Sequence, residues 1–377
     1  MQKSKKSKKS KRGSSDFLLL VSIIALVFIG IVMVFSASWP EAMVEKDDGY
    51  FFLRKQLISA IIGSVAMVFF MNFDYRRLKK LSLPIYILSL ISGLLIFSPL
   101  GSTRKGARRW INLGFTTFMP SDAIKVGSVI FFAAFLANKK DKVRSFKEGV
   151  IPALLYMGLS CGLIYLQKDL GTTITLAATM VGMFFISGMK LGLLFVFGAA
   201  GALVLYLSSR GEGNEFRANR WTSFLDPFKD KLNTGWQAVQ SLYALGSGGL
   251  FGLGLGKSRQ KFFYIPEAYN DFIFSIIGEE LGLIGSLIVL LLFIIVIWRG
   301  ILIALKTEDL FGCYLASGIV ALIAIQSLIN IAVVTSSIPT TGITLPFISY
   351  GGTSLLFYMS AVGILLNISR YAKLDRS

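Results

Sequence analysis

Long, continuous apolar stretches recur from one end of the chain to the other, and short polar or charged segments separate them. A stretch of about 20 residues crosses a hydrocarbon layer of about 30 Å when it is helical. The apolar residues are contiguous and do not alternate with polar ones, which favours membrane helices over the strands of a membrane barrel. The pattern predicts an all-α, polytopic integral membrane protein with about ten transmembrane helices, at 17–36, 53–72, 82–99, 121–138, 149–167, 172–189, 191–208, 272–297, 310–335 and 350–368.

Basic residues predict the orientation of these helices. Lys and Arg gather in the two tails and in the short loops at 74–80, 139–148 and 299–309. Because cytoplasmic loops carry the excess of Lys and Arg, both termini are expected to be cytoplasmic. We expect a disordered basic tail at 1–16, one ten-helix domain at 17–369 with a large outer loop at about 209–270, and a cytoplasmic tail at 370–377.

Composition narrows the chemistry that these helices can carry. The net charge of +18 would suggest nucleic acid in a soluble protein, but here topology and anionic membrane lipid account for the basic residues, and no nucleic acid is expected. The chain has no histidine, so proton transfer near neutral pH must use carboxylates, lysine or tyrosine. Cys161 and Cys313 lie inside apolar stretches and are interpreted as small core residues. No P-loop sequence occurs, which argues against ATP-driven transport by this chain alone.

Two groups of charged residues stand out near the fourth predicted helix. Arg108 and Arg109 precede Trp110, and arginines beside an aromatic ring suit a phosphate next to a sugar or a lipid. The same residues also fit snorkelling to lipid headgroups beside an interfacial tryptophan. Asp122 and Lys125 are three residues apart and share one helix face, either as ionisable groups that face a cavity or as a helix-capping pair.

The long outer region has internal order. Residues 236–245 fit a short amphipathic helix that lies on the membrane. The glycine-rich segment 246–256 lets the backbone approach a ligand closely, although it also suits a plain packing loop. Two cations, Lys257 and Lys261, come directly after it.

Carboxylates mark the mouth of the eighth predicted helix. Glu267 and Asp271 lie at its start, and Glu279 and Glu280 lie two to three turns further along, at membrane depth. Carboxylates inside a membrane are candidates for function, and one at such a mouth suits the role of general base. Two further outer regions are expected, an acidic loop near 41–48 and a loop at 336–350 whose prolines and glycines indicate irregular backbone lining a cavity.

Five segments, in chain order, carry a resemblance to a known family: GARRWINLG, PSDAIK, QKDLGT, QSLYALGSGGLFGLGLGKSRQKFFYIPEAYNDFIFSIIGEELG and ITLPFISYGGTSLL. On these motifs the chain is similar, over nearly its whole length after the tail, to the SEDS family (shape, elongation, division and sporulation), which includes FtsW, RodA and SpoVE. The form PTTGITLPFISYGG looks closer to the FtsW and SpoVE branch than to RodA.

The resemblance implies a peptidoglycan glycosyltransferase that polymerises lipid II into glycan strands at the outer face of the bacterial cytoplasmic membrane. It implies two substrates, lipid II and a glycan linked to undecaprenyl pyrophosphate. It also implies a class B penicillin-binding protein as partner, in cell division or sporulation. The essential aspartate of the family falls on Asp271, its acidic–lysine pair on Asp122 and Lys125, and its Arg–Trp motif on Arg109 and Trp110.

In the implied reaction, Asp271 takes the proton of the acceptor hydroxyl and undecaprenyl pyrophosphate leaves the donor. The leaving group needs a counter-charge, from protein cations alone or with a divalent cation such as Mg²⁺ or Mn²⁺; no other cofactor is implied. The expected substrate-binding residues are Arg108, Arg109, Trp110, Asp122, Lys125, Lys257, Lys261, Glu267 and Glu280. The chain departs from the family in having Asp122 where glutamate is usual, and Tyr269 and Asn270 where His-Thr is usual.

Two other functions stay open on the sequence alone. A lipid II flippase or other transporter would use the same ten helices and membrane-depth charges without touching a reacting bond. A scaffold would recruit a penicillin-binding partner without any chemistry. Formation of glycan by the purified protein would separate the glycosyltransferase from both.

Overall fold

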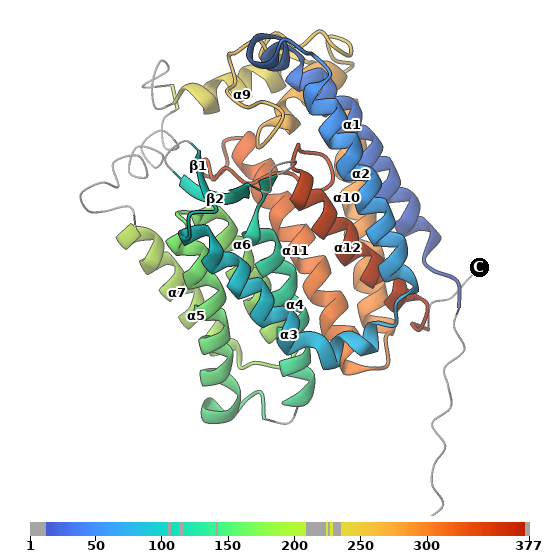
Figure 1. The fold of residues 1–377 in the computed structure, drawn as a ribbon, viewed down its shortest axis with the longest axis vertical. Coiled ribbons are helices and arrows are strands. Elements are labelled where there is room, and N and C mark those ends of the chain that lie inside the picture. The colour runs from blue at the N-terminus through green and yellow to red at the C-terminus, as the bar shows by residue number, and fades with distance from the viewer. Residues whose placement is uncertain are drawn as a thin grey trace, which may run out of the picture.

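The computed structural model describes residues 13–104, 107–112, 117–140, 142–208, 224, 227–228 and 235–373. Most of the predicted outer loop between 209 and 234, and the outermost residues of both predicted tails, therefore lie outside the described residues. Helices standing side by side form the body of the molecule (Figure 1). They are α1 (Phe17–Lys46), α2 (Phe51–Asn72), α3 (Tyr75–Leu94), α4 (Pro120–Asn138), α5 (Ile151–Leu166), α6 (Leu170–Ile186), α7 (Leu191–Ser208), α9 (Trp236–Ser247), α10 (Ile273–Lys306), α11 (Leu310–Val334) and α12 (Gly352–Ser369).

Each of the ten predicted membrane segments coincides with a helix, which confirms the all-helical polytopic architecture. Eight helical segments in the described part of the chain have the length and hydropathy to cross a membrane. The helix α6 is also apolar but has only 17 residues, and α7 is apolar over 18 residues. The predicted amphipathic helix near 236–245 is present as α9. The orientation of the bundle and the domain boundaries stay predictions.

Two features differ from the sequence-based expectation. The acidic segment near 41–48, expected as a loop, belongs mostly to α1, which runs past Pro40 and ends where Asp47 adopts a left-handed conformation with φ of 51°. In addition, β1 (Gly101–Arg104), β2 (Ala107–Asn112) and β3 (Thr117–Phe118) form a small antiparallel sheet in the order β1-β2-β3. Both segments are short, so the periodicity of their apolar residues does not predict which secondary structure they form.

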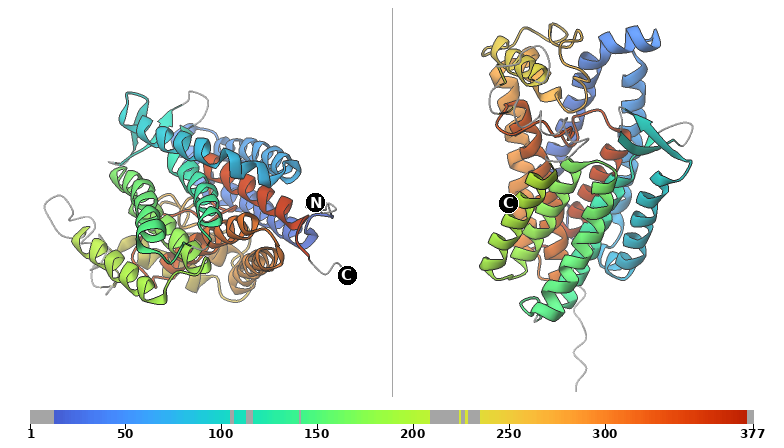
Figure 2. Two further views of the ribbon diagram at one scale, coloured as in Figure 1. Left: turned by 90° about the horizontal axis from the view of Figure 1, so that it is seen from below. Right: turned by 90° about the vertical axis from the view of Figure 1, so that its left-hand side faces the viewer.

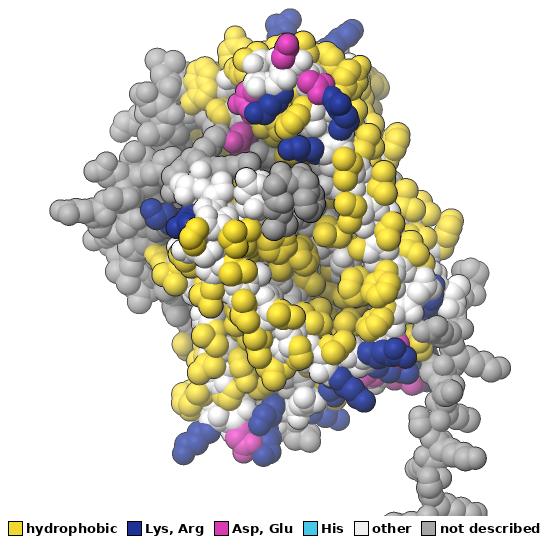
Figure 3. Space-filling model, viewed as in Figure 1, with side chains coloured by type: hydrophobic (Ala, Val, Ile, Leu, Met, Phe, Trp, Pro, Cys, Tyr) yellow, Lys and Arg dark blue, Asp and Glu magenta, His cyan; other side chains and the backbone are white. Residues whose placement is uncertain are grey.

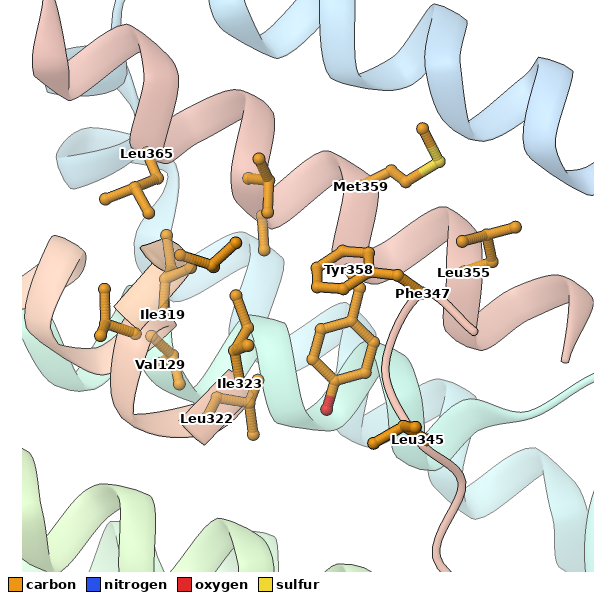
Figure 4. Close-up of a cluster of buried hydrophobic side chains, with 14 of the residues drawn as sticks. Val129, Ile319, Leu322, Ile323, Leu345, Phe347, Leu355, Tyr358, Met359 and Leu365 are labelled. Carbon is orange, nitrogen blue, oxygen red and sulfur yellow. The ribbon is translucent and has the colours of Figure 1, made fainter. Parts of the chain in front are cut away.

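The interior of the bundle lies where α4, α11 and α12 meet. The helix α11 packs against α10 on one side and α4 and α6 on the other, while α12 packs along α2. Figure 4 shows the apolar contacts at this centre, where Val129 of α4, Ile323 of α11 and Tyr358 of α12 point toward one another. Two views at right angles show the same arrangement of neighbours (Figure 2).

The outside of the bundle is suited to lipid. Apolar side chains cover the flank of the molecule, and the charged side chains lie mainly toward its upper and lower ends (Figure 3). On α10 the exposed apolar residues recur at helical spacing: Ile284, Leu287, Ile288, Leu291 and Ile294. An apolar surface of this extent on a helix bundle needs acyl chains or another protein around it.

At the end of the bundle that holds both described chain ends, buried polar contacts join the helices. The side-chain amide of Asn367, which is fully buried, donates to Met71 O at 2.8 Å and accepts from Tyr75 N at 3.0 Å. Asp16 forms an ion pair with Arg299 at 2.5 Å. These contacts fix α12 to the α2–α3 connection and α1 to α10.

The helix α10 is interrupted at Gly282, whose φ of 67° and ψ of −165° are not helical. A glycine-rich loop forms backbone hydrogen bonds with the residues on both sides of this interruption. Leu253 N and Gly254 N donate to the carbonyls of Glu279 and Glu280, while the amides on the other side of the break donate to Gly249 O and Leu250 O. The predicted glycine-rich packing loop is therefore joined to a broken membrane helix.

Replacing Gly252 by alanine should loosen this joint. Gly252 has φ of +80°, and an added Cβ would lie 2.1 Å from Glu280 O. The matched control is Gly256→Ala, because Gly256 has a similar φ of +82° but open space around the Cβ position. Both variants should lose about 1–2 kcal/mol from the positive φ. Only Gly252→Ala should lose more, since the clash must also break hydrogen bonds worth about 1 kcal/mol each.

Thermal unfolding in detergent measures the difference between the two variants. Equal unfolding temperatures would show that the backbone joint does not stabilise the bundle.

Candidate functional site

An ion pair lies at the start of α4. Pro120 occupies the first turn, where its missing N–H costs nothing. Asp122 Oδ1 lies 3.0 Å from Lys125 Nζ, and both side chains are only 4% exposed. The i, i+3 pairing predicted from the sequence is therefore present. The N-cap residue of this helix is Met119, which makes no side-chain capping hydrogen bond.

Buried polar groups surround this pair. Lys125 Nζ donates to Gln326 Oε1 at 3.0 Å and to Tyr358 Oη at 3.3 Å, and it lies 5.0 Å from the centre of the Tyr358 ring. Thr353 Oγ1 donates to Asp122 Oδ2 at 3.3 Å. The pair thus joins α4 to α11 and α12, and hydrogen bonds offset the cost of burying its charges.

Asp271 lies two residues before α10, in a turn, and is partly exposed. One of its carboxylate oxygens lies 3.8 Å from the position that a Cβ would take at Gly342. Its backbone carbonyl accepts a hydrogen bond from Asn330 Nδ2 at 2.7 Å. The predicted irregular loop at 336–350 therefore borders this carboxylate.

A cleft of about 280 Å³ lies beside the same turn, between the end of α1 and residues 261–268. Glu41, Glu267 and Lys261 are among its lining residues. Glu267 adopts φ of 52° and its carboxylate accepts from Asn270 Nδ2 at 2.9 Å. Burial, and next the negative charge of Glu41, raise the pKa of Tyr269, whose hydroxyl donates to Glu41 Oε1 at 2.8 Å.

Glu280 and Lys261 form a second buried ion pair, 2.8 Å apart, with side chains 0% and 4% exposed. The Glu280 carboxylate also accepts from Gly256 N at 2.9 Å and from the hydroxyl of Ser36. Next to it, Glu279 accepts from Ser258 Oγ at 2.5 Å and from two backbone amides. These carboxylates hold the glycine-rich loop and its continuation against α10.

The basic and aromatic group predicted from the sequence lies on β2. Arg108 donates to Ser98 O at 2.5 Å, and Arg109 donates to Lys168 O and lies 3.9 Å from the Asp169 carboxylate. Within the described residues, the Nε atoms of both arginines are buried and lack a hydrogen-bond partner. Trp110 is half-buried on the same strand. Both arginines are nevertheless partly exposed, so part of each side chain is open to the surroundings.

The structure brings some of the predicted residues together and separates others. Gln326 and Asn330 of α11 connect the Asp122–Lys125 pair to the turn that carries Asp271. The Glu280–Lys261 pair belongs to a different network around the broken helix, and Lys257 is exposed on the adjoining loop.

Four further residues of these networks were not predicted from the sequence: Gln326, Asn330, Thr353 and Tyr358. The available signal was the pair of amides four residues apart in an apolar helix, because polar side chains inside a membrane usually have partners. No group of three or more Cys, Asp or Glu side chains in the described ranges is arranged to hold a metal ion.

Comparisons with known proteins give matches along nearly the whole chain. Residues 16–374 match the family model for FtsW, RodA and SpoVE, described as cell cycle protein. The chain is 45% identical to Stage V sporulation protein E of Bacillus subtilis (strain 168), over 97% of this chain and 99% of that protein. It is 41% identical to the probable peptidoglycan glycosyltransferase FtsW of Trichlorobacter lovleyi, over 95% and 94% of the two chains.

Two solved structures share the fold. A chain from a study of the structural coordination of polymerization and crosslinking by a peptidoglycan synthase complex superimposes with a TM-score of 0.78 at 25% identity, covering 96% of this chain and 99% of that one. The crystal structure of the rod shape determining protein RodA of Thermus thermophilus gives a TM-score of 0.70 at 25% identity, covering 96% and 98%.

Breaking the Glu280–Lys261 pair should destabilise the bundle strongly. Glu280→Gln keeps the shape of the side chain but leaves Lys261 as a buried charge without its counter-ion, a loss of about 3–5 kcal/mol. The control is Glu308→Gln, because Glu308 pairs with Lys373 at 2.5 Å on the surface, where both side chains are mostly exposed. Its unfolding temperature should stay at the wild-type value. A Glu280→Gln protein as stable as Glu308→Gln would contradict a framework role for this pair.

Proposed function

The chain belongs to the FtsW, RodA and SpoVE family of cell cycle proteins, and from this premise we propose that it is a peptidoglycan glycosyltransferase that polymerises lipid II. The observation that carries the proposal is the 41% identity, along 95% of the chain, to a probable peptidoglycan glycosyltransferase. The site supports it, because the partly exposed carboxylate of Asp271 stands at the start of a membrane helix and is bordered by an irregular loop.

Asp271 is the proposed general base. It accepts the proton of the acceptor sugar hydroxyl while the hydroxyl oxygen forms a bond to the anomeric carbon of the donor. The bond from that carbon to undecaprenyl pyrophosphate breaks with inversion, and the leaving group departs with the electron pair. Because the chain has no histidine, a carboxylate is the natural group for this proton transfer near neutral pH.

The pyrophosphate is proposed to bind at Arg108 and Arg109, with Trp110 beside the sugar. Both arginine side chains are partly exposed, and charge-assisted bonds from guanidinium to phosphate are strong. Lys257 is exposed on the loop and adds a cation. A divalent cation such as Mg²⁺ stays a prediction; substrate phosphates typically supply several of its ligands.

The remaining predicted residues are proposed to hold the site in shape. Asp122 and Lys125 complete a closed network at the start of α4, and Lys261 and Glu280 complete another at the break in α10. Glu267 lines the cleft between the end of α1 and residues 261–268. In this proposal these groups determine where the reacting sugars lie, while Asp271 carries the proton transfer.

Location and partner follow from the same proposal. The protein acts at the outer face of the bacterial cytoplasmic membrane, with both termini in the cytoplasm, as the positive charge of the tails and of loops such as 74–80 indicates. It acts with a class B penicillin-binding protein in cell division or sporulation. The similarity to a chain of a peptidoglycan synthase complex supports a partner of this kind.

Replacing Asp271 by asparagine should abolish polymerisation without unfolding the protein. General base catalysis is worth about 10²- to 10⁴-fold, so glycan formation from lipid II by purified protein, with and without a class B partner, should fall by at least about 10²-fold. The control is Glu308→Gln, a surface carboxylate that should leave the rate unchanged.

Near-normal polymerisation by Asp271→Asn would remove Asp271 as the base. If the wild type forms no glycan under any partner condition, the glycosyltransferase proposal fails. Lipid II crossing in protein-containing liposomes would then separate a flippase from a scaffold.

A further inference from the structure

Three successive carbonyls lead to the proposed base, and each accepts a hydrogen bond from a distant part of the chain. Tyr269 O accepts from Tyr350 N at 3.0 Å, and Asn270 O accepts from Ser349 Oγ at 2.5 Å. Asp271 O accepts from Asn330 Nδ2 at 2.7 Å. The backbone of this turn is therefore held by α11 and by the loop that follows it.

Asn330 is the centre of this arrangement. It is 1% exposed, and its Nδ2 group donates a second hydrogen bond to Ile343 O at 2.7 Å. One amide thus fixes the carbonyl of Asp271 and the loop that borders the Asp271 carboxylate. Because α10 begins only at Ile273, Asp271 lies outside that helix. Its backbone is held instead by the hydrogen bond from Asn330 of α11.

Gln326 lies four residues before Asn330 and therefore on the same face of α11. Its Nε2 group donates to Thr344 O at 2.9 Å, next to the carbonyl that Asn330 holds. Its Oε1 atom accepts from Lys125 Nζ at 3.0 Å and from the hydroxyl of Tyr358. A continuous series of contacts therefore runs from the Asp122–Lys125 pair through the loop to Asp271.

We propose that Asn330 is the residue that positions Asp271 for catalysis, and that Gln326 supports it by tying the same loop to Lys125. The inference rests on the proposed function of Asp271 as general base. Neither amide touches the reacting atoms in this proposal. Each acts through the backbone that it holds, and a displacement of about 1 Å at a reacting group can cost about 10²-fold in rate.

The test compares Asn330→Leu with Asn367→Leu. Leucine has the branching and the number of side-chain heavy atoms of asparagine, but it is larger and neither donates nor accepts a hydrogen bond. Asn367 is equally buried in α12 and also bonds to two backbone groups, but at the other end of the bundle. Both variants should lower the unfolding temperature, so the comparison cancels the general cost of losing a buried amide.

Only Asn330→Leu should change catalysis by the folded protein. We expect its kcat for lipid II polymerisation to fall by about 10- to 100-fold with KM within about threefold of wild type, and the acid limb of the pH–rate profile to move. Asn367→Leu should keep the wild-type kcat and profile. Equal kcat values for the two variants, with unmoved profiles, would overturn the proposal.

A second readout does not depend on activity. In a background with Cys161→Ala and Cys313→Ala, the variant Asp271→Cys reports on the turn through its rate of labelling by a maleimide. Adding Asn330→Leu should change that rate at least about threefold, and adding Asn367→Leu should leave it unchanged. An inactive wild type would end the proposed function, whereas an unaltered labelling rate in the Asn330→Leu background would end the positioning role.

Discussion

Backbone that leaves a regular helix inside a membrane must find hydrogen-bond partners within the protein, and the most unusual parts of this structure depend on that requirement. The interruption at Gly282 exposes amides and carbonyls on both sides of the break. Loop 248–254 supplies their partners, and its glycines allow the two backbones to come within contact distance. Glycine is needed at position 252 because a side chain there would meet Glu280 O and separate the two segments.

The two buried ion pairs have different surroundings and therefore different consequences. The Glu280 carboxylate accepts hydrogen bonds from two backbone amides and pairs with Lys261. It therefore holds the loop against the broken helix. The charges of Asp122 and Lys125 instead meet side chains of α11 and α12. The first pair stabilises one local joint, whereas the second connects three helices at the centre of the bundle and leads, through Gln326, toward Asp271.

Local sequence patterns predicted the parts of the structure that local interactions determine. The membrane helices follow from apolar stretches, α9 from its amphipathic pattern, and the Asp122–Lys125 pair from i, i+3 spacing. The contact between Asn330 and Asp271 spans 59 residues, and no periodicity indicates which carbonyl an isolated amide will hold. Local patterns likewise did not predict the small sheet or the end of α1. Short strands, and a helix that continues past a proline, have no distinctive pattern in a single sequence.

The two departures from the family pattern have structural explanations. Asp122 is one methylene shorter than the usual glutamate, yet it still reaches Lys125 at 3.0 Å because the two residues lie on adjacent turns of one helix face. Tyr269 replaces a histidine that could relay a proton. Its hydroxyl donates to Glu41, and burial raises its pKa, so it remains protonated. Tyr269 therefore ties α1 to the turn of Asp271, and in the proposed mechanism it does not relay the proton that Asp271 accepts.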